Sequence, residues 1–167
     1  MYVTIADFVA EWRREAEITE KVLDGLSDES LSTRVYPEGR TLGRIAWHFT
    51  SNIPEYLQQF GLQIDEVDDA EHVPQSAKHI ADTFRKVSNA AAQALSKQWT
   101  DEHLREVQHA FGRQETNAQI VMGLIKHIVH HRGQITVLMR QAGLKPYGVY
   151  GPPKEDWAQL GVMVPPL

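Results

Sequence analysis

The sequence predicts an all-α protein, a four-helix bundle with a Gly/Pro-rich C-terminal tail packed on it. Four long segments place apolar residues at steps of three and four, which is the period of an amphipathic helix. No segment carries a convincing alternation of apolar and polar residues of the kind that indicates a strand. Four amphipathic helices joined by longer polar connections are expected to pack their apolar faces around one core.

The first helix is predicted from about Ile5 to Leu26. Asp7 and Glu11 favour its first turns because negative charge stabilises a helix N-terminus, and Gly25 argues for its end. The second helix is predicted to begin after Thr41 as N-cap and to run to about Phe60.

Pro54 lies inside this second pattern, so we expect it to kink the helix or to break it near Ile53. Residues 61–75 are polar and are predicted to form a loop. The third helix is expected from Ser76, a suitable N-cap, to about Lys97.

The segment 99–115 is mixed in character. It is predicted to hold either a short helix or a hairpin-like excursion around Val107, Phe111 and Gly112.

The fourth helix is predicted from about Thr116 to Ala142. Gly143 suits the position after a helix end, and Pro146 cannot continue a helix. Three aromatic side chains of the following tail are expected to pack on the helices: Tyr147, Tyr150 and Trp157.

Composition limits the classes of function. The 167 residues are expected to form one domain over 1–167, and 42% apolar with 23% charged residues is typical of globular proteins. The chain has no cysteine, which excludes disulfides, thiolate metal ligands and a cysteine nucleophile. A net charge of -5 with scattered basic residues disfavours nucleic-acid binding.

The sequence shows no recognisable signal peptide or membrane span. The N-terminus lacks the basic and apolar regions of a signal peptide, and no apolar run approaches the ~18 residues that a membrane span needs. We therefore expect a cytoplasmic protein with a small-molecule substrate and with no nucleic-acid or membrane partner.

His127 and His131 lie one turn apart in the predicted fourth helix. At about 100° per residue, His131 falls within about 40° of the centre of the apolar face and His127 lies near its edge, whereas His130 points well away. Two imidazoles at this spacing can bind one metal ion. They could instead be two core histidines, each with its own hydrogen-bond partners, and spacing alone leaves both interpretations open.

A third ligand must come from elsewhere in the chain. His48, in the predicted second helix, lies about 120° from the apolar face of a straight helix, which suits a ligand at the edge of a cleft better than a core residue. His79 and His109 are alternatives. His72 and His103 lie in polar surroundings and are expected to be exposed.

Three segments, TLGRIAWHFT, HIVHHRGQITVLMRQAG and the downstream KPYGVYGP, resemble the DinB/YfiT-like superfamily of metalloenzymes. The shared features are a His near the start of the second helix and a His-x-x-x-His pair followed by Arg-Gly-Gln. The resemblance implies a four-helix bundle and one divalent metal ion bound by His48, His127 and His131. It also implies thiol-dependent transferase or isomerase chemistry with bacillithiol, mycothiol or glutathione.

Three imidazoles leave an open position on a divalent ion, as in catalytic zinc sites. Imidazole does not select the metal, and we expect Zn or Ni. The leading hypothesis is a metal-dependent enzyme, by resemblance a thiol S-transferase. The alternatives are a metal-dependent hydrolase and a non-catalytic metal- or ligand-binding stress-response bundle, while acidity disfavours a DNA-related role.

The metal-site hypothesis includes candidate neighbours of the three histidines. No catalytic residue beyond the ligands is identified, and three side chains are candidates for hydrogen bonding to the ligands: Asn52, Glu55 and Gln134. A homodimer through exposed helix faces is a further expectation. Its candidate anchors are Trp12, Trp47 and Trp99; the alternative is that each of them is a core residue, which Trp12 suits best.

Overall fold

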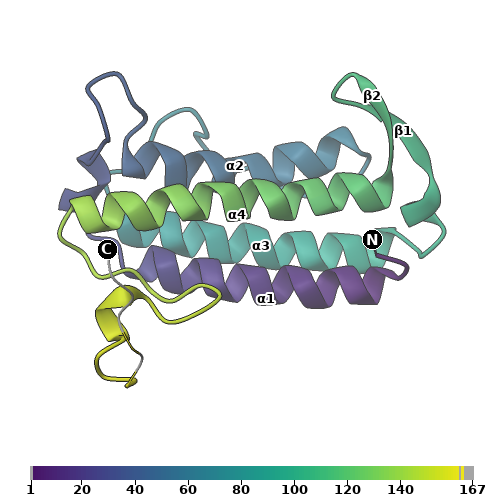
Figure 1. Cartoon of the computed structure of the whole chain (residues 1–167). Helices are drawn as coiled ribbons and strands as arrows, with labels where there is room; N and C mark the ends of the chain where they lie inside the picture. Colours follow the sequence, from purple (N-terminus) through teal and green to yellow (C-terminus); the bar gives the residue numbers. More distant parts are fainter. Residues whose placement is uncertain (1, 162, 164–167) are drawn as a thin grey trace.

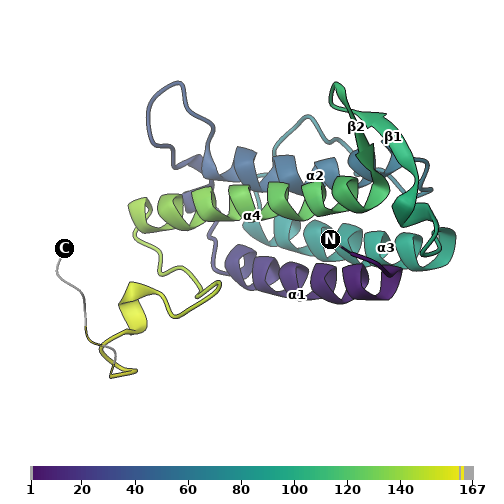
Figure 2. The same cartoon turned by 45° about the vertical axis from the view of Figure 1, so that its right-hand side comes forward.

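The computed structural model describes residues 2–161 and 163. Its four long helices lie side by side, as Figures 1 and 2 show, with α1 in contact with α3 and α4, and α2 in contact with the same two helices. Their bounds are α1 Ile5–Asp24, α2 Leu42–Gln59, α3 Ala77–Gln98 and α4 Asn117–Gln141. The predicted all-α four-helix bundle is therefore confirmed.

Every long helix begins at a hydroxyl N-cap. The side chains of Thr4, Thr41, Ser76 and Thr116 each accept a hydrogen bond from the backbone N–H three residues on. The Gln119 side chain also accepts from the Thr116 N–H, which completes a capping box at α4. The predicted starts of the last three helices are confirmed.

The end of α4 is a Schellman motif. Gly143 has φ of 76°, a conformation that glycine adopts without steric cost. The N–H of Leu144 donates to the carbonyl of Met139 at 2.8 Å, and the N–H of Gly143 donates to that of Arg140 at 3.1 Å. Gly143 therefore ends α4 as predicted.

Two predicted boundaries need correction. α1 ends at Asp24, two residues before Leu26. α2 continues through Pro54 to Gln59 and does not break near Ile53. Pro54 is buried, so the packed apolar face of α2 outweighs the single backbone hydrogen bond that proline cannot donate.

The segment between α3 and α4 contains both of the predicted alternatives. A short 3-10 helix at His103–Arg105 precedes a hairpin of β1 (Val107–Ala110) and β2 (Arg113–Thr116), which pair antiparallel. Ala110 faces Arg113 across a two-residue turn in which Phe111 and Gly112 have φ of 50° and 81°. Positive φ at both positions is typical of the type I′ turn, and the hairpin lies where the hairpin-like excursion was expected.

The three tryptophans proposed as dimer anchors lie in the core. Trp12 and Trp47 are each 1% exposed, and Trp99 is 8% exposed. The indole N–H of Trp12 donates to the carbonyl of Ser88 on α3 at 2.9 Å. None of them can anchor a partner, so that prediction was wrong, and a homodimer itself stays a prediction that sedimentation would check.

The C-terminal tail contacts the bundle through polar and ionic groups. The Tyr150 hydroxyl receives a hydrogen bond from Arg132 and donates one to Glu15. Arg140 of α4 pairs with Glu155 at 2.8 Å, while the pair of Lys145 with Asp156 lies within the tail. The tail therefore packs on α1 and α4 as predicted.

Two of the three tail aromatics make this packing, and the third does not. Tyr147 lies under the ammonium of Lys21, 5.3 Å from its ring centre. Trp157 instead donates to the carbonyl of Pro152 within the tail. In the part of the chain that the structure describes, no helix is long and apolar enough to cross a membrane.

Candidate metal centre

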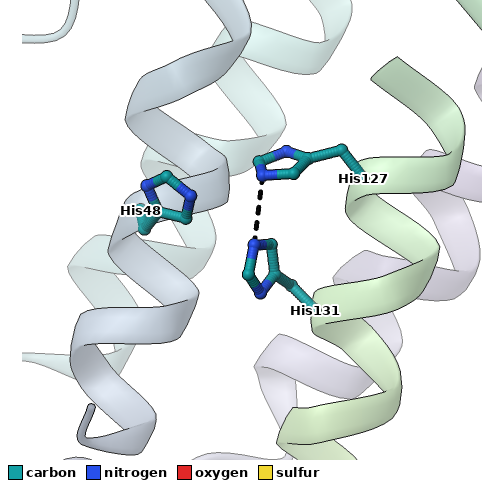
Figure 3. A group of neighbouring side chains, drawn as sticks. All are labelled: His48, His127 and His131. Atoms are coloured by element: carbon teal, nitrogen blue, oxygen red, sulfur yellow. Dashed lines mark hydrogen bonds between the residues drawn. The ribbon is translucent and has the colours of Figure 1, made fainter. Parts of the chain in front are cut away.

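Three imidazoles converge between α2 and α4. His48 projects from α2 towards His127 and His131 on α4, as Figure 3 shows. One ring nitrogen of each residue lies within 4.8 Å of the other two, and the Nε2 atoms of His127 and His131 are 3.0 Å apart. The structure thus brings together the three residues that the family resemblance implied.

The helix positions of these residues follow the predicted facing. His131 is 7% exposed, His127 is half-buried, and His130 is exposed. His48 is half-buried, because its edge of α2 faces α4 while the apolar face of α2 packs into the core. The offset of His48 from that apolar face is therefore what places it at the site.

The remaining histidines lie away from the cluster. His79 is exposed on α3 beside Trp47, and His109 is exposed on β1. His72 is exposed, as predicted, and bonds to Asp69. His103 is half-buried rather than exposed, because its ring stacks on that of Trp99.

Gln134 fixes the tautomer of His131. Its amide oxygen lies 2.7 Å from His131 Nδ1, and its amide nitrogen lies 3.2 Å from His130 Nε2. An amide oxygen only accepts, so His131 carries its proton on Nδ1 and turns an Nε2 lone pair towards His127. Gln134 is thus placed as a support of the His131 imidazole, whereas Glu55 lies exposed on α2.

The three imidazoles are held neutral. Burial is the largest cause that lowers the pKa of His48, His127 and His131, and together with the neighbouring histidines it lowers that of His127 to about 4. The positive charge of Arg40 lowers all three further. Neutral imidazoles keep the lone pairs that metal binding requires.

The donor set fits a divalent ion. Ligand atoms about 2.0–2.1 Å from a tetrahedral ion lie about 3.3 Å from one another, close to the 3.0 Å between the two Nε2 atoms. His127 Nδ1 is buried and has no hydrogen-bond partner among the described residues. A proton can lie between the two Nε2 atoms, as in the hydrogen bond drawn in Figure 3, and a cation could take its place, so the arrangement is compatible with metal binding.

The pKa of His127 predicts that the metal-free protein loses stability as pH falls from about 6.5 to about 4. Its pKa is 6.5 in the unfolded chain and about 4 in the fold, so the unfolded state binds more protons within this window. The stability that the neutral His127 contributes is fully present above this pH window and is lost below it. Thermal unfolding of chelator-treated protein would measure the slope.

His127→Gln should flatten this slope, and His130→Gln, which removes an exposed neighbour that adds only a minor part of the His127 shift, should change it less. Equal slopes in the wild type and in His127→Gln would contradict the assignment.

Two cavities reach the cluster from opposite directions along the groove between α2 and α4. The first, of about 510 Å³, is called here the Arg40 cavity; its lining includes His131, Gln134 and Ile45. The second, of about 600 Å³, is called the Asn52 cavity and includes His127 and Tyr56. Each cavity therefore meets the cluster at a different histidine of α4.

The sequence interpretation missed Arg40, because a single arginine before the Thr41 N-cap carries no recognisable spacing. Asn52 was foreseen as a neighbour of the ligands, and it lines the cavity that His127 also lines. The pocket positions of both depend on contacts between α2 and α4 that no local pattern encodes.

Comparison with known proteins gives matches over nearly the whole chain. The sequence model of the DinB family matches residues 1–163. "Uncharacterized protein YrdA" of Bacillus subtilis (strain 168) is 44% identical over 167 residues, which cover 100% of both chains.

Two solved structures are similar. A DinB-like protein from Bacillus cereus shares 49% identity with a TM-score of 0.85, over 90% of this chain and 100% of that one. The DinB-like protein YjoA of Bacillus subtilis, with 18% identity and a TM-score of 0.58 over 87% and 99% of the two chains, shows likeness of fold alone.

Proposed function

Because this chain belongs to the DinB family, we propose that it is a divalent-metal-dependent enzyme that transfers a group to a low-molecular-weight thiol. His48, His127 and His131 would hold the ion, with Zn or Ni as the expected metal. The observation that carries the proposal is the convergence of three neutral imidazoles from two helices.

A divalent ion held in this way supplies Lewis acidity, which lowers the pKa of a water or thiol bound to it. The protein residues hold and orient the ligands. Gln134 keeps the His131 proton on Nδ1, and Phe49 lies against the His131 ring at a centroid distance of 6.4 Å. Both contacts fix the direction in which His131 presents its lone pair.

Two features favour transfer to a thiol. The Arg40 and Asn52 cavities provide separate spaces beside the imidazoles, and a transferase must bind two reactants. The chain contains no cysteine, so sulfur chemistry requires an external thiol. Hydrolysis would need only one of the two cavities.

Metal analysis of the untagged protein is the first test. We expect about one Zn or Ni ion per chain, removable by a chelator. The second test is incubation with glutathione, bacillithiol or mycothiol and a panel of electrophiles, with mass spectrometry to detect the joined product.

Turnover should stop after chelation and return when Zn or Ni is added. A protein that contains no metal after purification and binds none when Zn or Ni is added would contradict the proposal. Metal-dependent loss of electrophile that proceeds equally without thiol would make the protein a hydrolase instead.

A further inference from the structure

The Arg40 cavity contains a cation without a protein partner. Among residues 2–161 and 163, no hydrogen bond or ion pair links the Arg40 guanidinium to another residue. Its neighbours Arg34 and Arg44 differ, because each donates at 2.8 Å to a backbone carbonyl, of Pro37 and Glu71 respectively. Arg40 therefore keeps its donors available to a ligand.

The walls of the same cavity are apolar. Val35, Tyr36 and Val137 are 62%, 59% and 53% exposed, and all three line this one cavity. Buried Ile45 and Leu138 also line it. Exposed apolar side chains gathered around a concave surface are typical of a ligand-binding pocket.

The cavity opens on the candidate metal centre. His131 and Gln134 lie in its lining, so a ligand inside it would contact the group that supports the His131 ring. Arg40 and His131 line the same cavity, so the guanidinium and one imidazole of the cluster face a common space.

We propose that the Arg40 cavity binds the electrophilic substrate, and that this substrate is a small organic anion with an apolar body. Its carboxylate or phosphate would pair with the Arg40 guanidinium, whose planar fork matches both groups, and its body would lie against Val35, Tyr36 and Val137. The substrate role rests on the proposed function. Recognition of the anion does not, since Arg40 is not one of the three imidazoles.

The thiol would then enter from the other side. The Asn52 cavity is lined by polar and cationic groups, among them Gln119, Lys126 and Arg113. The same cavity is also lined by Phe111, Met122 and Glu115, and Glu115 pairs with Arg113. Lys126 is therefore the cation of this lining without a partner among the described residues that could meet a polar thiol. The reacting ends of the two substrates would meet beside the imidazoles.

Three probes with a phenyl-alkyl body test the proposal on the full chain: 4-phenylbutyrate, 4-phenylbutyl phosphate and the uncharged 4-phenylbutan-1-ol. Their dissociation constants would be measured by NMR titration of both chelator-treated and Zn-loaded protein. We expect at least one anion to bind about tenfold more tightly than the alcohol. The tighter of the two anions identifies carboxylate or phosphate as the head group.

Arg40→Gln should weaken anion binding at least about tenfold and leave alcohol binding unchanged. Arg44→Gln is the matched control, because it removes an exposed arginine of the same region that is already hydrogen bonded, and it should have no effect. Val137→Ser should weaken all three probes about threefold through lost apolar contact. Unchanged melting temperatures would show that the variants are folded.

Anion binding that survives Arg40→Gln unchanged would overturn the proposal, as would an alcohol that binds as tightly as the anions. Binding that disappears on chelation would also overturn it, because the ion would then hold the anion. If the protein binds no metal but the probes still depend on Arg40, only the proposed function fails.

Discussion

Replacing Arg132 with Met is expected to lower the free energy of unfolding by about 3–5 kcal/mol. The Arg132 side chain is 1% exposed and pairs with the 8% exposed Glu15 at 2.6 Å. It also donates to the Glu15 carbonyl at 3.1 Å and to the Thr19 hydroxyl at 3.0 Å. Its removal leaves the Glu15 carboxylate buried without a counter-charge, which denaturant unfolding at pH 7 would detect.

Two comparisons isolate the cause. The double variant Glu15→Leu with Arg132→Met should recover much of the loss, because apolar residues of similar volume often replace a buried ion pair at little cost. Arg140→Met removes a partner of Glu155 from a partly exposed pair on the same helix and should cost less than about 1 kcal/mol. An Arg132→Met variant no less stable than Arg140→Met would contradict the argument.

The Glu15–Arg132 pair also bears on the candidate metal centre. It joins α1 to α4 at the residue after His131, and Tyr150 of the tail bonds to both members of the pair. It therefore fixes the rotation of α4 at the point where His131 must face α2. A buried charge pair that costs desolvation energy can be retained for this positional role.

The helix boundaries could be predicted because their determinants are local. Thr41, Ser76 and Thr116 cap helices through hydrogen bonds that span three residues, and Gly143 ends α4 through its own backbone conformation. The break considered at Pro54 does not occur, for the opposite reason. Tertiary packing of α2, which its local pattern does not report, outweighs the loss of one backbone donor.

Features that depend on distant contacts could not be predicted. Glu15 and Arg132 are 117 residues apart in sequence, and each taken alone has the polarity of a surface position. The local hairpin was expected only as an alternative to a short helix, because its strands have four residues each and the Phe111–Gly112 turn lacks the common Asn-Gly signature.

The candidate site was predictable in part. The His127/His131 pair follows from helical spacing, but the angle of His48 only allowed it to be a ligand among several histidines. The family resemblance nominated His48, and the contact of α2 with α4 brings it to the pair. Arg40 had no such pattern, since its proximity to His131 arises from a loop packed beside the end of α4.

Replacing His127 with Ala is expected to weaken Zn binding by more than about a hundredfold. Removal of an outer residue that supports a ligand already costs 10–100-fold, and His127 would be a ligand itself. Its buried ring cannot be replaced by the exposed His130, which lies on another face of α4. Competition with a chromogenic chelator at pH 7.5 would measure the affinity, and His48→Ala should show the same loss.

Two further variants give this experiment a graded scale. Gln134→Ala should weaken binding about 10–100-fold, because His131 loses the acceptor that holds its proton on Nδ1. His130→Ala should have a smaller effect than Gln134→Ala, since His130 reaches the site only through the Gln134 amide. If His127→Ala and His130→Ala weakened binding equally, the ion would not be held by the three converging imidazoles.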